Sequence, residues 1–121
     1  MSIGTNDSLN DISALQNVTS SIHTIEFWFN PELTNINGLQ GITTVTSEIE
    51  FYNNDSLLNL DGLVNINSLN GLLRIVGNDN LSNLCGLNNL IVNGGLNGQY
   101  AVNVNLYNPT QQDIIDGDCS L

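Results

Sequence analysis

Two glutamates and one arginine recur at a constant interval and are the residues that come nearest to a catalytic group. Glu26, Glu50 and Arg74 are spaced 24 residues apart. If they occupy equivalent places on neighbouring strands, the two carboxylates lie about 4.8 Å apart, near the roughly 5 Å of a retaining glycosidase. Any pair of stacked strands produces that distance, however, so it is not specific for hydrolysis. We therefore interpret these residues as part of a solvated strand face.

Other catalytic arrangements lack essential residues. His23 is the one histidine, no G-x-S-x-G nucleophile motif occurs, and no glycine-rich phosphate loop ends in Lys-Ser or Lys-Thr. A polysaccharide lyase generally needs basic residues, and Arg74 is the one strongly basic side chain. The sequence therefore predicts a non-catalytic protein with no catalytic residues and no cofactor.

Aspartates raise the question of a calcium site. Asp113, Asp116 and Asp118 lie close together, and Asp55 and Asp79 are 24 residues apart. None of them fits the D-x-[DN]-x-[DN]-G calcium loop. Two cysteines and one histidine are also too few for a zinc site. No metal site is predicted.

Two aromatic residues share the spacing of the glutamates. Trp28 and Tyr52 each stand two positions after a glutamate, and exposed aromatic rings beside charges suit sugar stacking or protein contact. The same residues are also favoured on any solvated strand, and both interpretations stay open. The predicted ligand-binding set is Glu26, Trp28, Glu50, Tyr52 and Arg74.

The charge balance excludes one class of partner. Twelve acidic residues and a single Lys or Arg give a net charge of −11. Nucleic acid binding needs several basic contacts to phosphates, so we expect no nucleic acid partner. No apolar stretch approaches the roughly 18 residues of a membrane span, so no membrane insertion is expected. Residues 1–10 lack the features of a signal peptide.

A 24-residue repeat organises the chain. Leucines occur at positions 9, 33, 57 and 81, and further apolar, small and asparagine columns keep the same step. A period of this length indicates stacked repeat units. Asparagine is frequent, with 22 occurrences, and one asparagine column is expected to form a hydrogen-bonded ladder. The ladder column is Asn6, Asn30, Asn54 and Asn78.

Within each unit the apolar spacing changes. The first half of a unit keeps a step of three, as in Leu33, Ile36 and Leu39, whereas residues 49–52 alternate. Alternation predicts a strand with one buried face. We therefore predict a single all-β domain over residues 1–121, a β-solenoid with units at residues 6–29, 30–53, 54–77 and 78–107 and a C-terminal cap at 108–121. Glu26, Glu50 and Arg74 should point outward.

The units resemble a known family. The segments N-P-E-L-T-N-I-N-G-L-Q-G-I and N-D-S-L-L-N-L-D-G-L-V-N-I, at residues 30–42 and 54–66, resemble leucine-rich-like repeats of bacterial surface proteins, which are similar to the receptor L-domain. The resemblance implies a right-handed parallel β-helix and a secreted or cell-surface setting. Residues 107–119 look like the C-terminal cap of such arrays, with a short helix between Pro109 and Gly117.

The last unit departs from the period. Asn78 and Asn108 are 30 residues apart, and the six additional residues are assigned to a glycine-rich loop at 93–98. Cys85 and Cys119 are predicted to form a disulfide that ties the cap to this unit, which would favour an oxidising compartment. Two free thiols are the alternative.

Three functions fit this organisation. The preferred one is an extracellular or cell-surface recognition or adhesion module that binds a protein or glycan. The second is a structural segment of a longer array, with end-to-end self-association through the N-terminal unit, which would present an open edge. The third is ice binding, which ranks low because Thr43, Thr44 and Thr46 do not recur in register.

Overall fold

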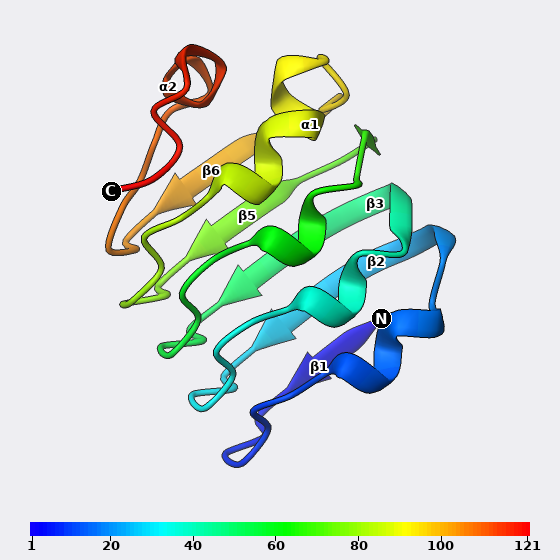
Figure 1. The fold of residues 1–121 in the computed structure, drawn as a ribbon, viewed down its shortest axis with the longest axis vertical. Helices are drawn as coiled ribbons and strands as arrows, with labels where there is room; N and C mark the ends of the chain where they lie inside the picture. Colours follow the sequence, from blue (N-terminus) through cyan, green and yellow to red (C-terminus); the bar gives the residue numbers. More distant parts are fainter.

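The computed structural model describes residues 1–121 and contains one open sheet of six parallel strands with helical segments over one of its faces (Figure 1). The strands follow the order β1-β2-β3-β5-β6, and the short β4 also pairs with β3. The strands are β1 (Ser2–Gly4), β2 (Ser20–Trp28), β3 (Ile42–Tyr52), β4 (Ser68–Leu69), β5 (Leu73–Val76) and β6 (Tyr100–Asn103).

Short helices connect the strands. Four of them are 3₁₀ helices, and two are α-helices of five and six residues. They are η1 (Ser13–Asn17), η2 (Asn37–Leu39), η3 (Asp61–Leu63), η4 (Cys85–Leu87), α1 (Asn88–Val92) and α2 (Gln111–Asp116). None of these helices is long and apolar enough to cross a lipid bilayer.

The prediction of an all-β, right-handed parallel β-helix is wrong. The molecule has a single sheet that does not close, and the other side of each unit is built from helical turns, so the fold is a small mixed α/β domain. The apolar step of three explains the difference. A 3₁₀ helix has three residues per turn, and each segment with this spacing contains one such turn, η2, η3 or η4.

The 24-residue period sets the register of the central strands. Ile25 pairs with Ile49, and Ile49 pairs with Leu73, so equivalent positions of successive units are neighbours in the sheet. The alternating residues point as predicted, because Phe27 and Phe51 are fully buried. Their rings stack with centroids 5.3 Å apart and an interplanar angle of 8°.

The hydrophobic core lies between the sheet and the helical turns. It takes in the leucine and isoleucine columns of units two to four, including Leu33, Leu57 and Leu81. In the first unit, Leu9 and Leu15 are only half-buried and pack against the edge of this core. The repeat columns therefore predict the core well, except where a unit has a neighbour on one side alone.

A glycine column allows the helical turns to approach one another. A Cβ atom at Gly38, Gly62 or Gly86 would lie 2.1, 1.9 or 1.8 Å from a carbonyl oxygen of the preceding unit. No side chain fits at such distances, so these three positions require glycine. The first unit has Ala14 at the corresponding place in η1.

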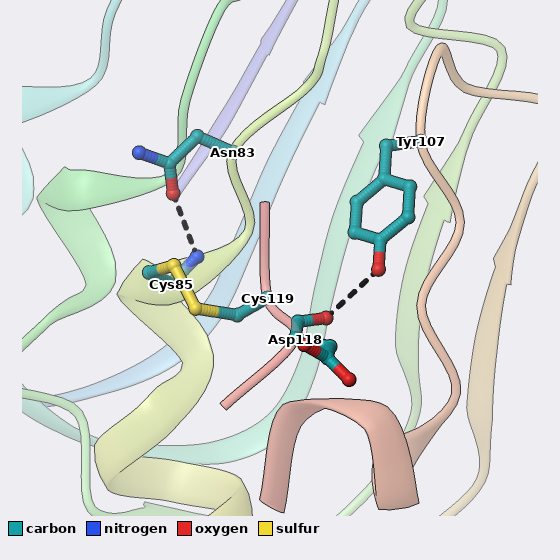
Figure 2. Close-up of a disulfide and its surroundings, with 5 residues drawn as sticks. All are labelled: Asn83, Cys85, Tyr107, Asp118 and Cys119. Atoms are coloured by element: carbon teal, nitrogen blue, oxygen red, sulfur yellow. Dashed lines mark hydrogen bonds between the residues drawn. A yellow bond between two sulfur atoms is a disulfide. The ribbon is translucent and has the colours of Figure 1, made fainter. Parts of the chain in front are cut away.

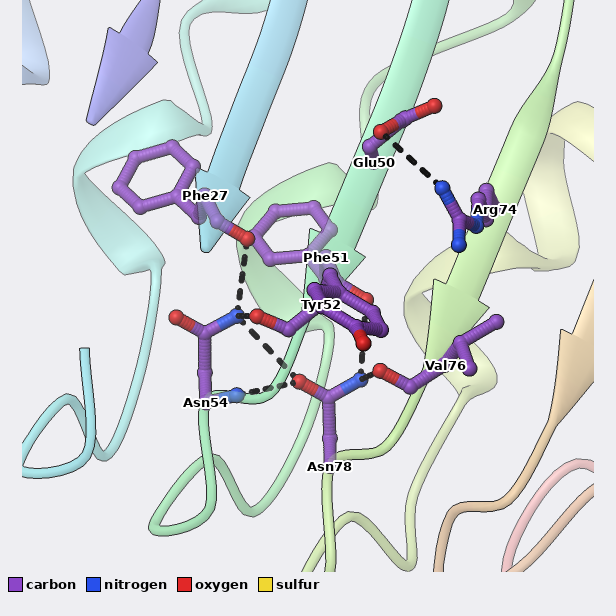
Figure 3. A network of polar contacts seen from close by, with 8 residues as sticks. All are labelled: Phe27, Glu50, Phe51, Tyr52, Asn54, Arg74, Val76 and Asn78. Carbon is purple, nitrogen blue, oxygen red and sulfur yellow. Dashed lines mark hydrogen bonds and ion pairs between the residues drawn. The ribbon is translucent and has the colours of Figure 1, made fainter. Parts of the chain in front are cut away.

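The predicted asparagine ladder is present. The Asn30 amide nitrogen donates to Asn54 Oδ1 at 3.0 Å, and the Asn54 amide nitrogen donates to Asn78 Oδ1 at 3.3 Å. Asn54 and Asn78 also donate to the backbone carbonyls of Phe27 and Phe51 (Figure 3). The side chains thus satisfy backbone groups that are buried where the strands end.

The last unit is three residues longer than the others, and not six. Tyr100 of β6 pairs with Leu73 at a separation of 27, and Asn105, rather than Asn108, accepts the ladder hydrogen bond of Asn78. Asn108 instead accepts from Asn105 at 3.0 Å and ends the ladder. The glycine-rich stretch stays close to the preceding unit, since a Cβ at Gly95 would lie 1.9 Å from a carbonyl oxygen.

The C-terminal cap is fastened covalently. Cys85 and Cys119 form the predicted disulfide, with Cα atoms 4.9 Å apart (Figure 2). The hydroxyl of Tyr107 donates to the Asp118 carbonyl beside it. The cap also contains the expected short helix, α2, which ends at Gly117 in a left-handed conformation. The disulfide is compatible with an oxidising environment.

Candidate recognition surface

One face of the sheet has no helices over it. The helical segments all lie on the opposite face (Figure 1). Because successive residues of a strand point to opposite sides, the neighbours of the buried residues line the uncovered side, which we call the open face. It contains all five residues that the sequence predicts for ligand binding, namely Glu26, Trp28, Glu50, Tyr52 and Arg74.

The two aromatic residues are neighbours but are half-buried rather than fully exposed. Trp28 and Tyr52 pair directly across β2 and β3. The indole of Trp28 lies against Gly4 of β1, where an added Cβ would be 2.0 Å from a ring carbon. Strand β1 therefore supports the indole from one side and leaves the rest of the side chain available.

The ring of Tyr52 has two partners. The guanidinium carbon of Arg74 lies 5.2 Å from its centroid, which is a cation–π distance. The ring of Phe29 meets it edge-on, with centroids 5.4 Å apart. These contacts restrict the rotamers of Tyr52, so a ligand that touched this ring would find it already oriented.

The predicted arrangement of the charged residues is confirmed. Glu26 is the register partner of Glu50, and Glu50 is the partner of Arg74. The Arg74 guanidinium lies 3.8 Å from a Glu50 carboxylate oxygen, which compensates that carboxylate but not Glu26 (Figure 3). Glu26 accepts a hydrogen bond from the Ser2 hydroxyl instead. The open face thus keeps an excess of negative charge.

A third carboxylate of the open face was not predicted. Glu48 stands two residues before Glu50 on β3, close to the carboxyl group of Glu26. Partial burial, the neighbouring Glu26 carboxyl group and the charge of Glu50 raise the pKa of Glu48, and the charge of His23 opposes the rise. The alternation of β3 would have identified Glu48, because residues 48 and 50 must share a face.

His23 belongs to the same sheet, but its side chain has few polar partners. Its Nδ1 lies 3.1 Å from the Thr46 hydroxyl, and the side chain is exposed. No group of three or more histidine, cysteine or acidic side chains is arranged to hold a metal ion. The Asp113 carboxylate, considered above for calcium, accepts hydrogen bonds from the backbone and the side chain of Thr110 and caps α2.

The chemistry of the open face is that of noncovalent contact. Carboxylate oxygens accept hydrogen bonds from hydroxyl, ammonium and guanidinium groups. Aromatic rings pack against sugar rings or apolar side chains, and Arg74 can donate to an acceptor on a ligand. In comparisons with family models, with characterised proteins and with solved structures, no match to this chain was found.

Proposed function

We infer that the protein is a non-catalytic recognition or adhesion module that binds a protein or glycan through the open face. The observation that carries this proposal is a sheet face without covering helices on which Trp28 and Tyr52 are neighbours. Aromatic residues that are held by their neighbours, yet partly accessible, are typical of the centres of binding surfaces. The excess carboxylates around them supply acceptors that fix the orientation of a ligand.

An extracellular or cell-surface location belongs to the same proposal. The Cys85–Cys119 disulfide supports it, because such bonds persist in oxidising compartments. The resemblance of residues 30–42 and 54–66 to leucine-rich-like repeats of bacterial surface proteins also supports it. We propose that the chain is related to those repeats through its unit pattern.

The test compares two double variants. We expect Trp28→Ala with Tyr52→Ala to lower affinity at least tenfold for any ligand that the native chain binds on a glycan array or an array of extracellular protein domains. Leu58→Ala with Val64→Ala removes exposed apolar side chains outside the open face and is the matched control. Thermal unfolding of each variant verifies folding. Equal binding by the native chain and the aromatic variant would contradict the proposal.

The open edge of β1 favours a second candidate function, assembly into a longer array. β1 pairs with β2 on one side and has no strand on the other, and unpaired strand edges promote association. Sedimentation velocity from micromolar to millimolar concentration measures this directly. A sedimentation coefficient that rises with concentration supports assembly through the edge, and a constant monomer value contradicts it.

A further inference from the structure

A groove crosses the C-terminal ends of the strands, next to the part of the open face where Phe29 contacts Tyr52. It has a volume of about 410 Å³ and passes the residues that follow β1, β2, β3, β5 and β6. We call it the end groove. Its lining combines apolar side chains, Phe29, Pro31 and Val104, with the carboxylates of Asp7, Asp55 and Asp79.

Four of the residues that line the end groove have an unusual backbone conformation. Phe29, Asn53, Gly77 and Val104 all have positive φ angles, between 52° and 72°, because the chain turns in the same way after each strand. Glycine and asparagine tolerate this left-handed conformation, whereas bulky or β-branched residues are disfavoured there. The fold therefore accepts Gly77 and Asn53 at little cost, and it accepts Phe29 and Val104 only at a conformational penalty.

Packing in the hydrophobic core does not explain why Phe29 and Val104 occupy these positions. Phe29 is 45% exposed and Val104 is 66% exposed, and both face the groove. The rings of Phe29 and Tyr52 form a T-shaped pair, and neither Phe29 nor Val104 belongs to the hydrophobic core. The conformation itself comes from the turn that every unit makes, so only the choice of Phe29 and Val104 as its residues calls for an explanation, and strained residues are often found at binding sites.

The charged residues that line the end groove are all acidic. Asp7, Asp55 and Asp79 each follow a ladder asparagine directly, and all three are exposed. Pro31 has the same place in the second unit. No basic residue lines the groove, and the one arginine of the chain is on the open face, paired with Glu50. In a molecule with a net charge of −11, the groove therefore attracts cations.

We propose that the end groove binds an extended segment of another protein that contains lysine or arginine together with apolar residues. The basic side chains contact the aspartates, and the apolar side chains contact Phe29, Pro31 and Val104. The groove spans four intervals of about 4.8 Å between units, which matches about six residues of an extended chain. A linear segment suits a groove that runs along the stack.

The probe is a fluorescein-labelled peptide of about eight residues that contains lysine, valine and serine, with a second peptide in which glutamate replaces each lysine. Fluorescence anisotropy at physiological salt measures affinity. We expect the lysine peptide to bind and the glutamate peptide not to bind. Binding of a neutral oligosaccharide in the groove, without binding of the lysine peptide, would overturn the proposal.

Two pairs of variants separate a shaped site from general attraction by charge. Asp55→Asn with Asp79→Asn should weaken peptide binding at least tenfold and reduce its dependence on salt. Asp61→Asn with Asp116→Asn changes the net charge equally at exposed positions outside the groove and should change affinity less than twofold. An equal loss in both pairs would show that only the overall charge attracts the peptide.

A third double variant tests the two strained residues of the end groove, Phe29 and Val104. Phe29→Asn with Val104→Asn places in both positions the residue already tolerated at Asn53, so we expect an unchanged or higher unfolding temperature together with at least tenfold weaker peptide binding. Unchanged affinity would overturn the role of these side chains. Trp28→Ala on the open face should leave peptide binding intact, which distinguishes failure of this site from failure of the proposed function.

Discussion

Buried amide groups stabilise this molecule at the level of single residues. Asn30, Asn54 and Asn78 are fully buried, although asparagine is usually exposed. Each of them donates to a backbone carbonyl near the strand ends and accepts from the preceding asparagine. The ladder therefore replaces the water that would otherwise solvate these groups.

The first residue-scale prediction concerns Asn54→Ala. This substitution removes the acceptor of the Asn30 backbone and side-chain N–H groups and the donor to the Phe27 carbonyl. We expect a loss of about 3 kcal/mol in the free energy of unfolding, because buried groups remain unpaired. Urea unfolding measures it. Asn80→Ala, at an exposed site with one hydrogen bond to a backbone carbonyl, is the control and should cost under about 1 kcal/mol.

The short cap helix shows how a turn of the chain is stabilised at the level of an element. α2 begins after Thr110, whose side chain accepts from the Asp113 backbone while the Asp113 carboxylate accepts from the Thr110 backbone. This reciprocal pair satisfies N–H groups that a helix start leaves free. The hydrogen bonds from the backbone and then the side chain of Thr110 lower the pKa of Asp113 from its ordinary value of 3.8.

A pH dependence follows from this carboxylate. A group with a lowered folded pKa stabilises the fold above its unfolded value, and the contribution is lost as pH falls through the folded pKa. Asp113→Asn should therefore lower the unfolding temperature at neutral pH, and this effect should shrink as the pH falls through the lowered folded pKa. Thermal melts across this range test the prediction. Asp116→Asn, near the end of α2, should not lower the unfolding temperature at neutral pH. An equal decrease in both variants would contradict the capping role of Asp113.

The sequence predicts the faces of the strands but not the helical turns between them. Alternation placed Phe27, Phe51 and the open-face residues correctly, because a strand has only two faces. The all-β prediction treats the step of three in Leu33, Ile36 and Leu39 as part of a coil of strands, although this spacing also matches a 3₁₀ turn. A strand buries every second residue, whereas a 3₁₀ helix has three residues per turn, so the spacing itself favours the helical turn and the all-β prediction overlooks it.

The register of the last unit and the end groove could not be read from residue types. Asn105 and Asn108 are equally suited to the ladder, and only the pairing of β6 decides between them. The groove depends on φ angles that Phe29 and Val104 do not suggest, because these residues normally avoid such a conformation. By contrast, Cys85 and Cys119 were paired correctly, as they are the two cysteines present.

For the molecule as a whole, the disulfide is the main restraint on the unfolded chain. It closes a loop across a sequence separation of 34 residues. In the loop-entropy model, such a bond contributes about 4 kcal/mol. We expect Cys85→Ala with Cys119→Ala to lower the free energy of unfolding by about this amount, measured by urea unfolding without reductant. An unchanged midpoint of urea unfolding would show that noncovalent contacts alone hold the cap. Thiol labelling of the unsubstituted protein, after denaturation, should find no free cysteine.

The glycine column of the helical turns decides how such a molecule can be lengthened by engineering. Duplicating residues 30–53 or 54–77 inserts a unit that supplies both a ladder asparagine and the required glycine. A unit of the same kind placed ahead of residue 1 would instead bring a carbonyl oxygen against the Cβ of Ala14. Insertion of a unit from within is therefore expected to need no other change, whereas extension at the first unit, including in-register association through β1, should be favoured by Ala14→Gly.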